Sequence, residues 1–144
     1  MDAAITKDFL DACNEALGFL VVDHGFHPAI LEVDDKIHFA TVSYQGKNAA
    51  VECIFDQSEH WVEVKIARGE DGARPVDYSI DSSGRRIRVE LYTLLIERGV
   101  RGFGPRVEGL SKKPLSDMFR IILFKDADLL KKHCQDVITD APRI

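Results

Sequence analysis

The chain has 144 residues, of which 45% are hydrophobic and 30% charged, and it carries a net charge of −5. This length suits a single domain, residues 1–144, and no run of about eighteen apolar residues indicates a membrane span. The acidic balance argues against a nucleic-acid partner, because non-specific nucleic-acid binders need basic faces, but it allows a basic protein partner.

The N-terminus and the cysteines both favour a cytoplasmic protein. The first residues include acids and further charges follow them, so we expect no secretory signal. The three cysteines, Cys13, Cys53 and Cys134, are far apart and lie in apolar patterns. Such spacing favours reduced core thiols over a disulfide framework.

A helix is predicted near the start of the chain. Between residues 5 and 17 the apolar positions recur at the spacing of one helical face. Gly18 is placed to end this helix, so residues 19–22 are predicted to form a short strand or extended segment. A further short strand is expected at residues 29–33, followed by an acidic turn at residues 34–36.

Residues 37–68 predict three consecutive strands joined by tight turns, and alternation divides these strands into two faces. We expect helices to cover the face that carries the apolar set Val51, Cys53, Phe55, Val62, Val64 and Ile66. The other face is predicted to be half-exposed and contains Ile54, Trp61 and Glu63. Because tryptophan is enriched at binding hot spots, this second face is the first candidate binding surface.

A second helix is predicted after a polar loop. Residues 81–83 are competent N-caps, and apolar positions at helical spacing predict a helix from about Ile87 to a stop at Gly99. Ile87 and Val89 fit a strand equally well, so the start of this helix is the weaker end of the prediction.

The following linker has four glycines between residues 99 and 109. Their order is not that of a dinucleotide-binding fingerprint, and the lysine of a P-loop is missing, so no phosphate cofactor is predicted. Arg101 and Arg106 lie on either side of Phe103, which we expect to be exposed. The three residues indicate a second contact surface, with a mobile connector as the alternative.

A long amphipathic face runs from Pro114 to Val137 and includes His133. Asp126 interrupts the pattern and is able to cap a new helix, so one bent helix and two helices both remain open. The chain as a whole predicts an α+β fold, with an antiparallel meander of four or five strands flanked by an N-terminal helix and C-terminal helices.

The positions of the histidines and cysteines do not favour a metal site or a catalytic nucleophile. His24 and His27 have the spacing of two metal ligands, but a zinc site needs three or four, and Gly25 and Pro28 favour a surface loop. Cys53 and His60 flank one hairpin, yet the alternation buries Cys53, which favours an inert thiol over a nucleophile. We therefore expect no catalytic residue, no metal site and no cofactor.

A pattern of hydrophobic positions extends over about residues 9–99. It comprises Leu17-Gly18-Phe19, Val42 and Tyr44, Val51-Glu52, Phe55-Asp56, then Val62, Val64 and Ile66, Tyr78, Leu91-Tyr92 and Leu94-Leu95. This order resembles that of small bacterial α+β proteins of the immunity-protein type, which are found beside secreted toxins, and of uncharacterised relatives. The resemblance implies a binding protein that neutralises a toxin.

Three hypotheses for the function follow. The first is a non-enzymatic protein-binding module, of the toxin-neutralising type, with a basic partner and with the binding residues Trp61, Glu63, Ile54, Phe103, Arg101 and Arg106. The alternative is a small-ligand-binding protein or small enzyme, with a pocket between sheet and helices lined by His24, His27, His60 or Tyr44. The third is a homodimer formed through the sheet edge or the Trp61 face.

Overall fold

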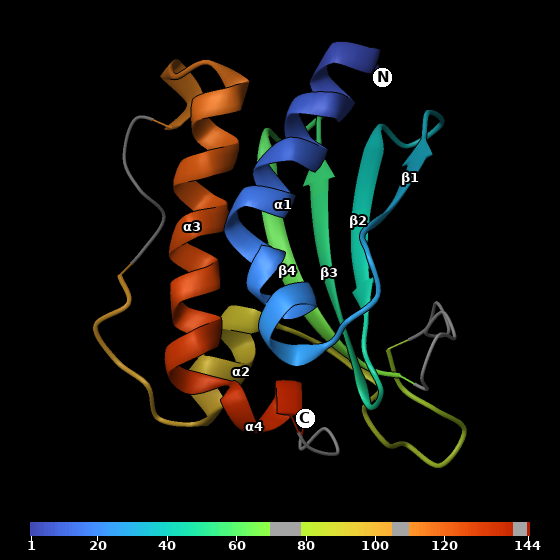
Figure 1. Cartoon of the computed structure of the whole chain (residues 1–144), viewed down its shortest axis with the longest axis vertical. Helices are drawn as coiled ribbons and strands as arrows, with labels where there is room; N and C mark the ends of the chain where they lie inside the picture. Colours follow the sequence, from blue (N-terminus) through green and yellow to red (C-terminus); the bar gives the residue numbers. More distant parts are fainter. Residues whose placement is uncertain (70–78, 105–109, 140–143) are drawn as a thin grey trace.

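The computed structural model describes residues 1–69, 79–104, 110–139 and 144, and it confirms the predicted α+β fold (Figure 1). The helices are α1 (Ala3–His24), α2 (Leu91–Glu97), the short 3₁₀ helix η1 (Leu110–Lys112), α3 (Leu115–His133) and α4 (Gln135–Thr139). The strands are β1 (Ile30–Asp34), β2 (Phe39–Gln45), β3 (Ala49–Asp56), β4 (Trp61–Arg68) and β5 (Arg88–Glu90). In these parts of the chain, every helix is too short or too polar to cross a membrane.

The five strands form one antiparallel sheet in the order β1-β2-β3-β4-β5, so each strand pairs with its neighbours along the chain. The register places Val42, Cys53 and Val64 in one row across the sheet. Residues directly opposite in an antiparallel pair point to the same face, so this row belongs to one face of the sheet. All three side chains are buried, as the alternation predicts.

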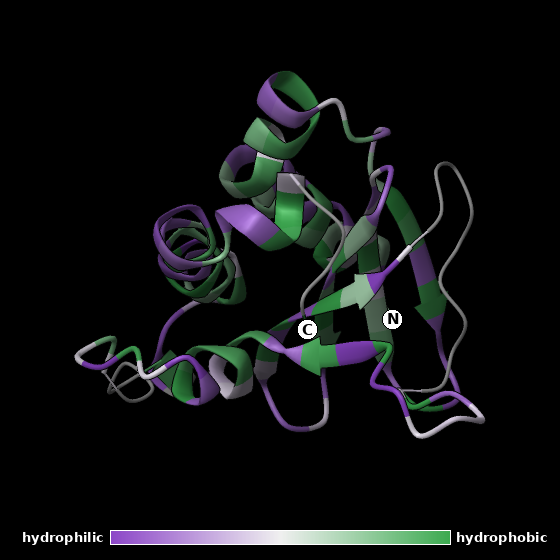
Figure 2. Cartoon of the chain, turned by 90° about the horizontal axis from the view of Figure 1, so that it is seen from below, coloured by the Kyte–Doolittle hydropathy of each residue, from purple (hydrophilic) through white to green (hydrophobic). Residues whose placement is uncertain are grey.

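Helices α1 and α3 pack side by side on that face of the sheet (Figures 1 and 2). Phe9 of α1 and Phe119 of α3 meet Phe55 of β3, with ring centroids 5.8 and 4.8 Å from the Phe55 ring. The rings of Phe9 and Phe119 are 5.1 Å apart, and all three side chains are fully buried. The Phe119 ring meets the other two rings edge-on, and aromatic contacts of this kind add stabilisation beyond the burial of their area.

The first helix is longer than its sequence pattern predicts. Gly18 lies inside α1, and residues 19–22 are helical, so the expectation of a strand there is wrong. Leu20 is fully buried and continues the apolar face of the helix, which offsets a cost of about 1 kcal/mol for a glycine in a helix interior. The helix ends at Gly25, whose φ of 70° is left-handed.

Residues before α2 also differ from the prediction. The helix does not begin near Ile87, because Arg88–Glu90 forms β5 and Val89 pairs with Ile66 of β4. Glu90 is the N-cap and accepts a hydrogen bond of 3.1 Å from the Thr93 N–H. Asp81, expected as a cap, instead accepts the N–H groups of residues 83 and 85, both at 2.9 Å, and so stabilises a tight turn.

The C-terminal segment forms two helices, and the break between them lies at Cys134 rather than at Asp126. Asp126 is buried within α3, and His133, predicted on the apolar face, is exposed. Arg98 holds the break together, because it donates to Asp136 of α4 at 2.7 and 2.9 Å and to the His133 carbonyl at 3.1 Å. The three cysteines are buried and unbridged, as expected.

Candidate functional site

The sheet has a second face, opposite the side that α1 and α3 cover. The side chains of β2, β3 and β4 that alternate with the buried rows point to it, and β1 and β5 extend it by register. We call this surface the outer face. It consists of Ile30, Glu32, Asp34, Phe39, Thr41, Ser43, Gln45, Ala50, Glu52, Ile54, Asp56, Trp61, Glu63, Lys65, Ala67, Arg88 and Glu90.

The outer face is acidic. It carries six acidic residues and only two basic ones, Lys65 and Arg88. Both basic residues already have acidic partners on this face, since Arg88 pairs with Glu52 and Lys65 lies 3.4 Å from Glu63. With a net charge of −5 for the whole chain, most of the acidic excess is concentrated here.

Apolar side chains lie among these acids. Phe39 and Trp61 flank Asp56 in one row across β2, β3 and β4, and both aromatic residues are half-buried. The next row contains Ile54 with Glu63 beside it, both also half-buried. The structure therefore brings together three of the predicted binding residues, Trp61, Glu63 and Ile54. Trp61 also packs against the core cluster.

One end of the outer face is closed by a buried ion pair that the sequence pattern did not reveal. The Arg88 guanidinium forms two hydrogen bonds with the Glu52 carboxylate, one of them, Nη2 to Oε2, at 3.1 Å. Only 8% and 12% of the two side chains are exposed. Arg88 belongs to β5 and Glu52 to β3, so the pair spans β4, where the small side chain of Ala67 leaves room. The sequence pattern predicts a helix at residue 88, and a helix there would not place the Arg88 side chain beside Glu52.

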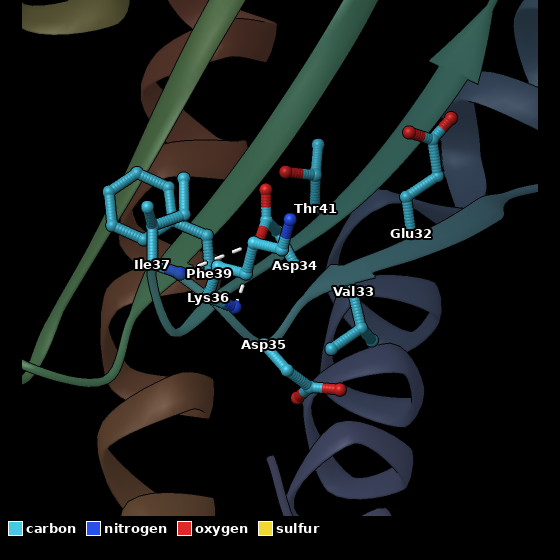
Figure 3. A pocket seen from close by; sticks show the side chains of 8 residues that line it. All are labelled: Glu32, Val33, Asp34, Asp35, Lys36, Ile37, Phe39 and Thr41. Carbon is cyan, nitrogen blue, oxygen red and sulfur yellow. Dashed lines mark hydrogen bonds between the residues drawn. The ribbon is translucent and has the colours of Figure 1, made fainter.

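The opposite end of the outer face opens into a depression at the β1–β2 hairpin, with a volume of about 830 Å³ (Figure 3). We call it the hairpin groove; residues 32–37, 39 and 41 line it. Its acids are Glu32, Asp34 and Asp35, and its apolar side chains include Val33 and Ile37. The sequence indicates Asp34 and Asp35 as turn formers and Glu32 as part of a short strand, but not the groove, because the groove depends on the β1–β2 register.

Asp34 and Asp35 in the hairpin groove form the following contacts. Asp34 Oδ1 accepts the N–H groups of Lys36 and Ile37 at 3.0 and 3.4 Å, which fixes the turn (Figure 3). Asp35 pairs with the N-terminal ammonium group of Met1. The turn is thus held by its own carboxylate, a common function of aspartate in tight turns.

Two of the three predicted binding residues of the linker, Arg101 and Phe103, lie away from the outer face. Phe103 is half-buried, with its ring 5.3 Å from that of Tyr92, so the expectation of an exposed phenylalanine is wrong. Arg101 is exposed and lines a pocket of about 290 Å³ beside Lys132 of α3. Arg106 lies outside the described residues. Arg101 and Phe103 therefore belong to a different surface from the outer face, because they line a pocket with residues of α3, which lies on the helical side of the sheet.

The side chains named for a small-molecule pocket do not all lie at one end of the sheet. Tyr44 is fully buried and donates a 2.8 Å hydrogen bond to Asn14 of α1. His27 lies at the same end of the sheet as Tyr44, since its N–H bonds to the Gln45 carbonyl, whereas His60 lies in the hairpin turn at the other end. Within the described ranges, no group of three or more histidine, cysteine or acidic side chains is suited to a metal ion.

Cys53 is not placed as a nucleophile. It is fully buried, and both a hydrogen bond with Cys13 and burial raise the pKa of its thiol. A thiol with a raised pKa forms little thiolate at neutral pH and is inert. His60 is exposed in the turn that joins β3 to β4, away from the middle of β3 where Cys53 lies.

Comparison of the chain with known protein families, with curated proteins and with solved structures finds no match. The likeness to immunity-type proteins therefore stays a hypothesis. The candidate site rests on the geometry of the described residues, among which the outer face and the hairpin groove are continuous through Glu32, Asp34, Phe39 and Thr41.

Proposed function

We propose that this chain is a non-enzymatic protein-binding module whose outer face binds a partner with a basic surface. One observation carries the proposal: the face opposite the helices combines an acidic excess with half-buried Trp61, Phe39 and Ile54. Interfaces gain affinity from a few central aromatic or apolar residues, while surrounding charges select the partner and accelerate the encounter.

A more specific form of this proposal is the neutralisation of a toxin. The resemblance to immunity-type proteins supports it, and so does the charge of the outer face, because an acidic surface imitates the phosphates that a nucleic-acid-cleaving toxin binds. Three buried free thiols favour a reducing compartment such as the cytoplasm as the place where the protein acts.

The test compares three baits in quantitative affinity capture from the native host. The wild type is compared with the double variant Trp61→Ala, Glu63→Lys and with a matched control, Asp8→Lys, which reverses a charge on α1. We expect a basic protein that the wild type and the control retain and the double variant loses. Equal capture by all three baits, or a captured partner that is acidic, would refute the proposal.

The toxin hypothesis requires a further measurement with the same partner. Expression of the captured protein alone is expected to stop growth of a test strain, and co-expression of the wild-type chain is expected to restore it. The double variant should restore growth less well than the control variant. A partner that leaves growth unaffected would exclude neutralisation while leaving the binding function in place.

A further inference from the structure

Strand β1 is an edge of the sheet. It pairs with β2 on one side, and in the described part of the chain no strand lies on its other side. Four of its five residues are exposed. Such an edge presents unpaired backbone N–H and C=O groups, which are a template for the addition of another strand.

Apolar side chains are unusually exposed along this edge. The exposed fractions are 43% for Ile30, 42% for Val33 and 55% for Ile37 in the adjoining turn. Val33 and Ile37 line the hairpin groove, which adjoins the outer face. A strand added beside β1 would cover these side chains and place its own in the groove.

The charges of β1 oppose pairing with a second copy. If two copies of β1 paired antiparallel about Glu32, each Glu32 would lie opposite the Glu32 of the other copy. If they paired about Val33, each Glu32 would lie opposite Asp34 of the other copy. Like charges directly opposite each other destabilise a sheet. Natural proteins protect their edges with charge in this way, but acids leave the edge open to a strand of opposite charge.

The alternation of β1 defines what such a strand must carry. Ile30, Glu32 and Asp34 point to the outer face, whereas Leu31 and Val33 point to the other side. A strand with basic residues at every second position places them opposite Glu32 and Asp34. Its intervening positions then suit apolar side chains, which pack against Leu31 and Val33.

We propose that β1 and the hairpin groove bind an extended segment of the partner, with alternating basic and apolar residues, by strand addition. This inference rests on the proposed function and makes it more specific. The backbone hydrogen bonds of such a complex supply affinity, and the alternating side chains supply specificity.

The test uses ¹⁵N-labelled full-length protein and a blocked eight-residue peptide of alternating lysine and valine. We expect chemical-shift changes at the amides of residues 30–34 and 37, together with slower hydrogen exchange within β1. Two control peptides separate the causes: one alternates glutamate and valine, and the other keeps lysine and valine but has N-methyl groups on alternate amides. Both should bind at least about tenfold more weakly, because one loses charge complementarity and the other loses backbone donors.

A charge-reversal variant then tests the site itself. Glu32→Lys should weaken binding of the lysine–valine peptide by about two- to fivefold, the range expected for an exposed ion pair. The control Asp8→Lys makes the same charge change on α1 and should bind the peptide like the wild type. Circular dichroism of both variants checks that the fold is kept.

Three results with the peptides or in sedimentation would overturn the inference. These are the absence of shifts in residues 30–34, equal affinity for the N-methylated peptide, and sedimentation showing a dimer that Glu32→Lys disrupts, which would assign the edge to a second copy. A native partner whose capture depends on Trp61 and Glu63 but not on Glu32 would remove strand addition and leave the proposed function standing. If capture of the native partner depends neither on Trp61 and Glu63 nor on Glu32, the proposed function is refuted as well.

Discussion

The Tyr92 hydroxyl donates a hydrogen bond of 2.7 Å to the Asp126 carboxylate in the interior between α2 and α3. Burial raises the pKa of Asp126 from an ordinary value of 3.8 to about 7, although the hydrogen bond itself acts in the opposite direction. Between these values the folded protein holds a proton that the unfolded chain releases. The stabilisation from this proton is complete below pH 4 and is lost as the pH rises towards 7.

Asp126→Asn should remove this pH dependence. The amide oxygen still accepts the Tyr92 hydrogen bond, and no charge has to be buried. We expect the two proteins to have the same free energy of unfolding near pH 4. Between pH 4 and pH 7 the free energy of unfolding of the variant should exceed that of the wild type by up to about 1.4 kcal/mol more for each pH unit. Urea unfolding of both proteins at several pH values between 4 and 8 measures the difference, and a difference independent of pH would contradict the assignment.

Replacing only one partner of the buried ion pair between Arg88 and Glu52 should destabilise the fold. Arg88→Met leaves the Glu52 carboxylate buried without its guanidinium, so we expect the free energy of unfolding to fall by about 3 kcal/mol. The double variant Arg88→Met, Glu52→Gln buries no charge and should recover part of this loss. Chemical denaturation of the two single variants and the double variant gives the coupling, and additive effects would show that the two side chains do not interact.

Gly46 is predicted to tolerate no side chain. A Cβ atom at this position would lie 2.7 to 2.9 Å from three ring atoms of Phe26, which is itself buried. Gly46→Ala therefore forces the Phe26 ring to move, and we expect a loss of about 1–3 kcal/mol in the free energy of unfolding. Thermal and urea unfolding measure this loss. An unchanged stability would show that the ring shifts without cost.

A side chain at Gly18, unlike one at Gly46, should stabilise the protein. Gly18 lies within α1, and no atom lies within 4 Å of a Cβ placed there, beyond the helix backbone and the neighbouring residues. Gly18→Ala should therefore stabilise the protein by about 0.5–1 kcal/mol, because alanine favours the helix. A helix that ended at this residue would give destabilisation instead. The sign of the change in urea unfolding distinguishes the two.

The sequence predicts correctly those parts of the fold in which the hydrophobic pattern of a single segment is sufficient. Alternation at Val51, Cys53 and Phe55 identifies the buried face without any knowledge of the rest of the chain, and it places Trp61 and Ile54 on the other face correctly. The same reasoning locates the outer face but not the hairpin groove. These residues were predictable because each strand carries its own pattern.

The remaining parts depend on distant partners. Val89 becomes part of a strand because Ile66 offers an edge to pair with, and nothing near Val89 distinguishes this from a helix. The ion pair of Arg88 and Glu52 and the hairpin groove exist only once the register is known. Residues after Gly18 stay helical because of burial against the sheet, which outweighs the local preference of glycine.

The aromatic triad of Phe9, Phe55 and Phe119 also has a consequence for synthesis on the ribosome. The strands β1 to β4 and helix α1 leave the ribosome first, but the ring that completes the triad belongs to α3. Until residue 119 has emerged, the apolar side of the nascent sheet is only partly covered and is open to chaperones. Release from such a chaperone should coincide with docking of α3.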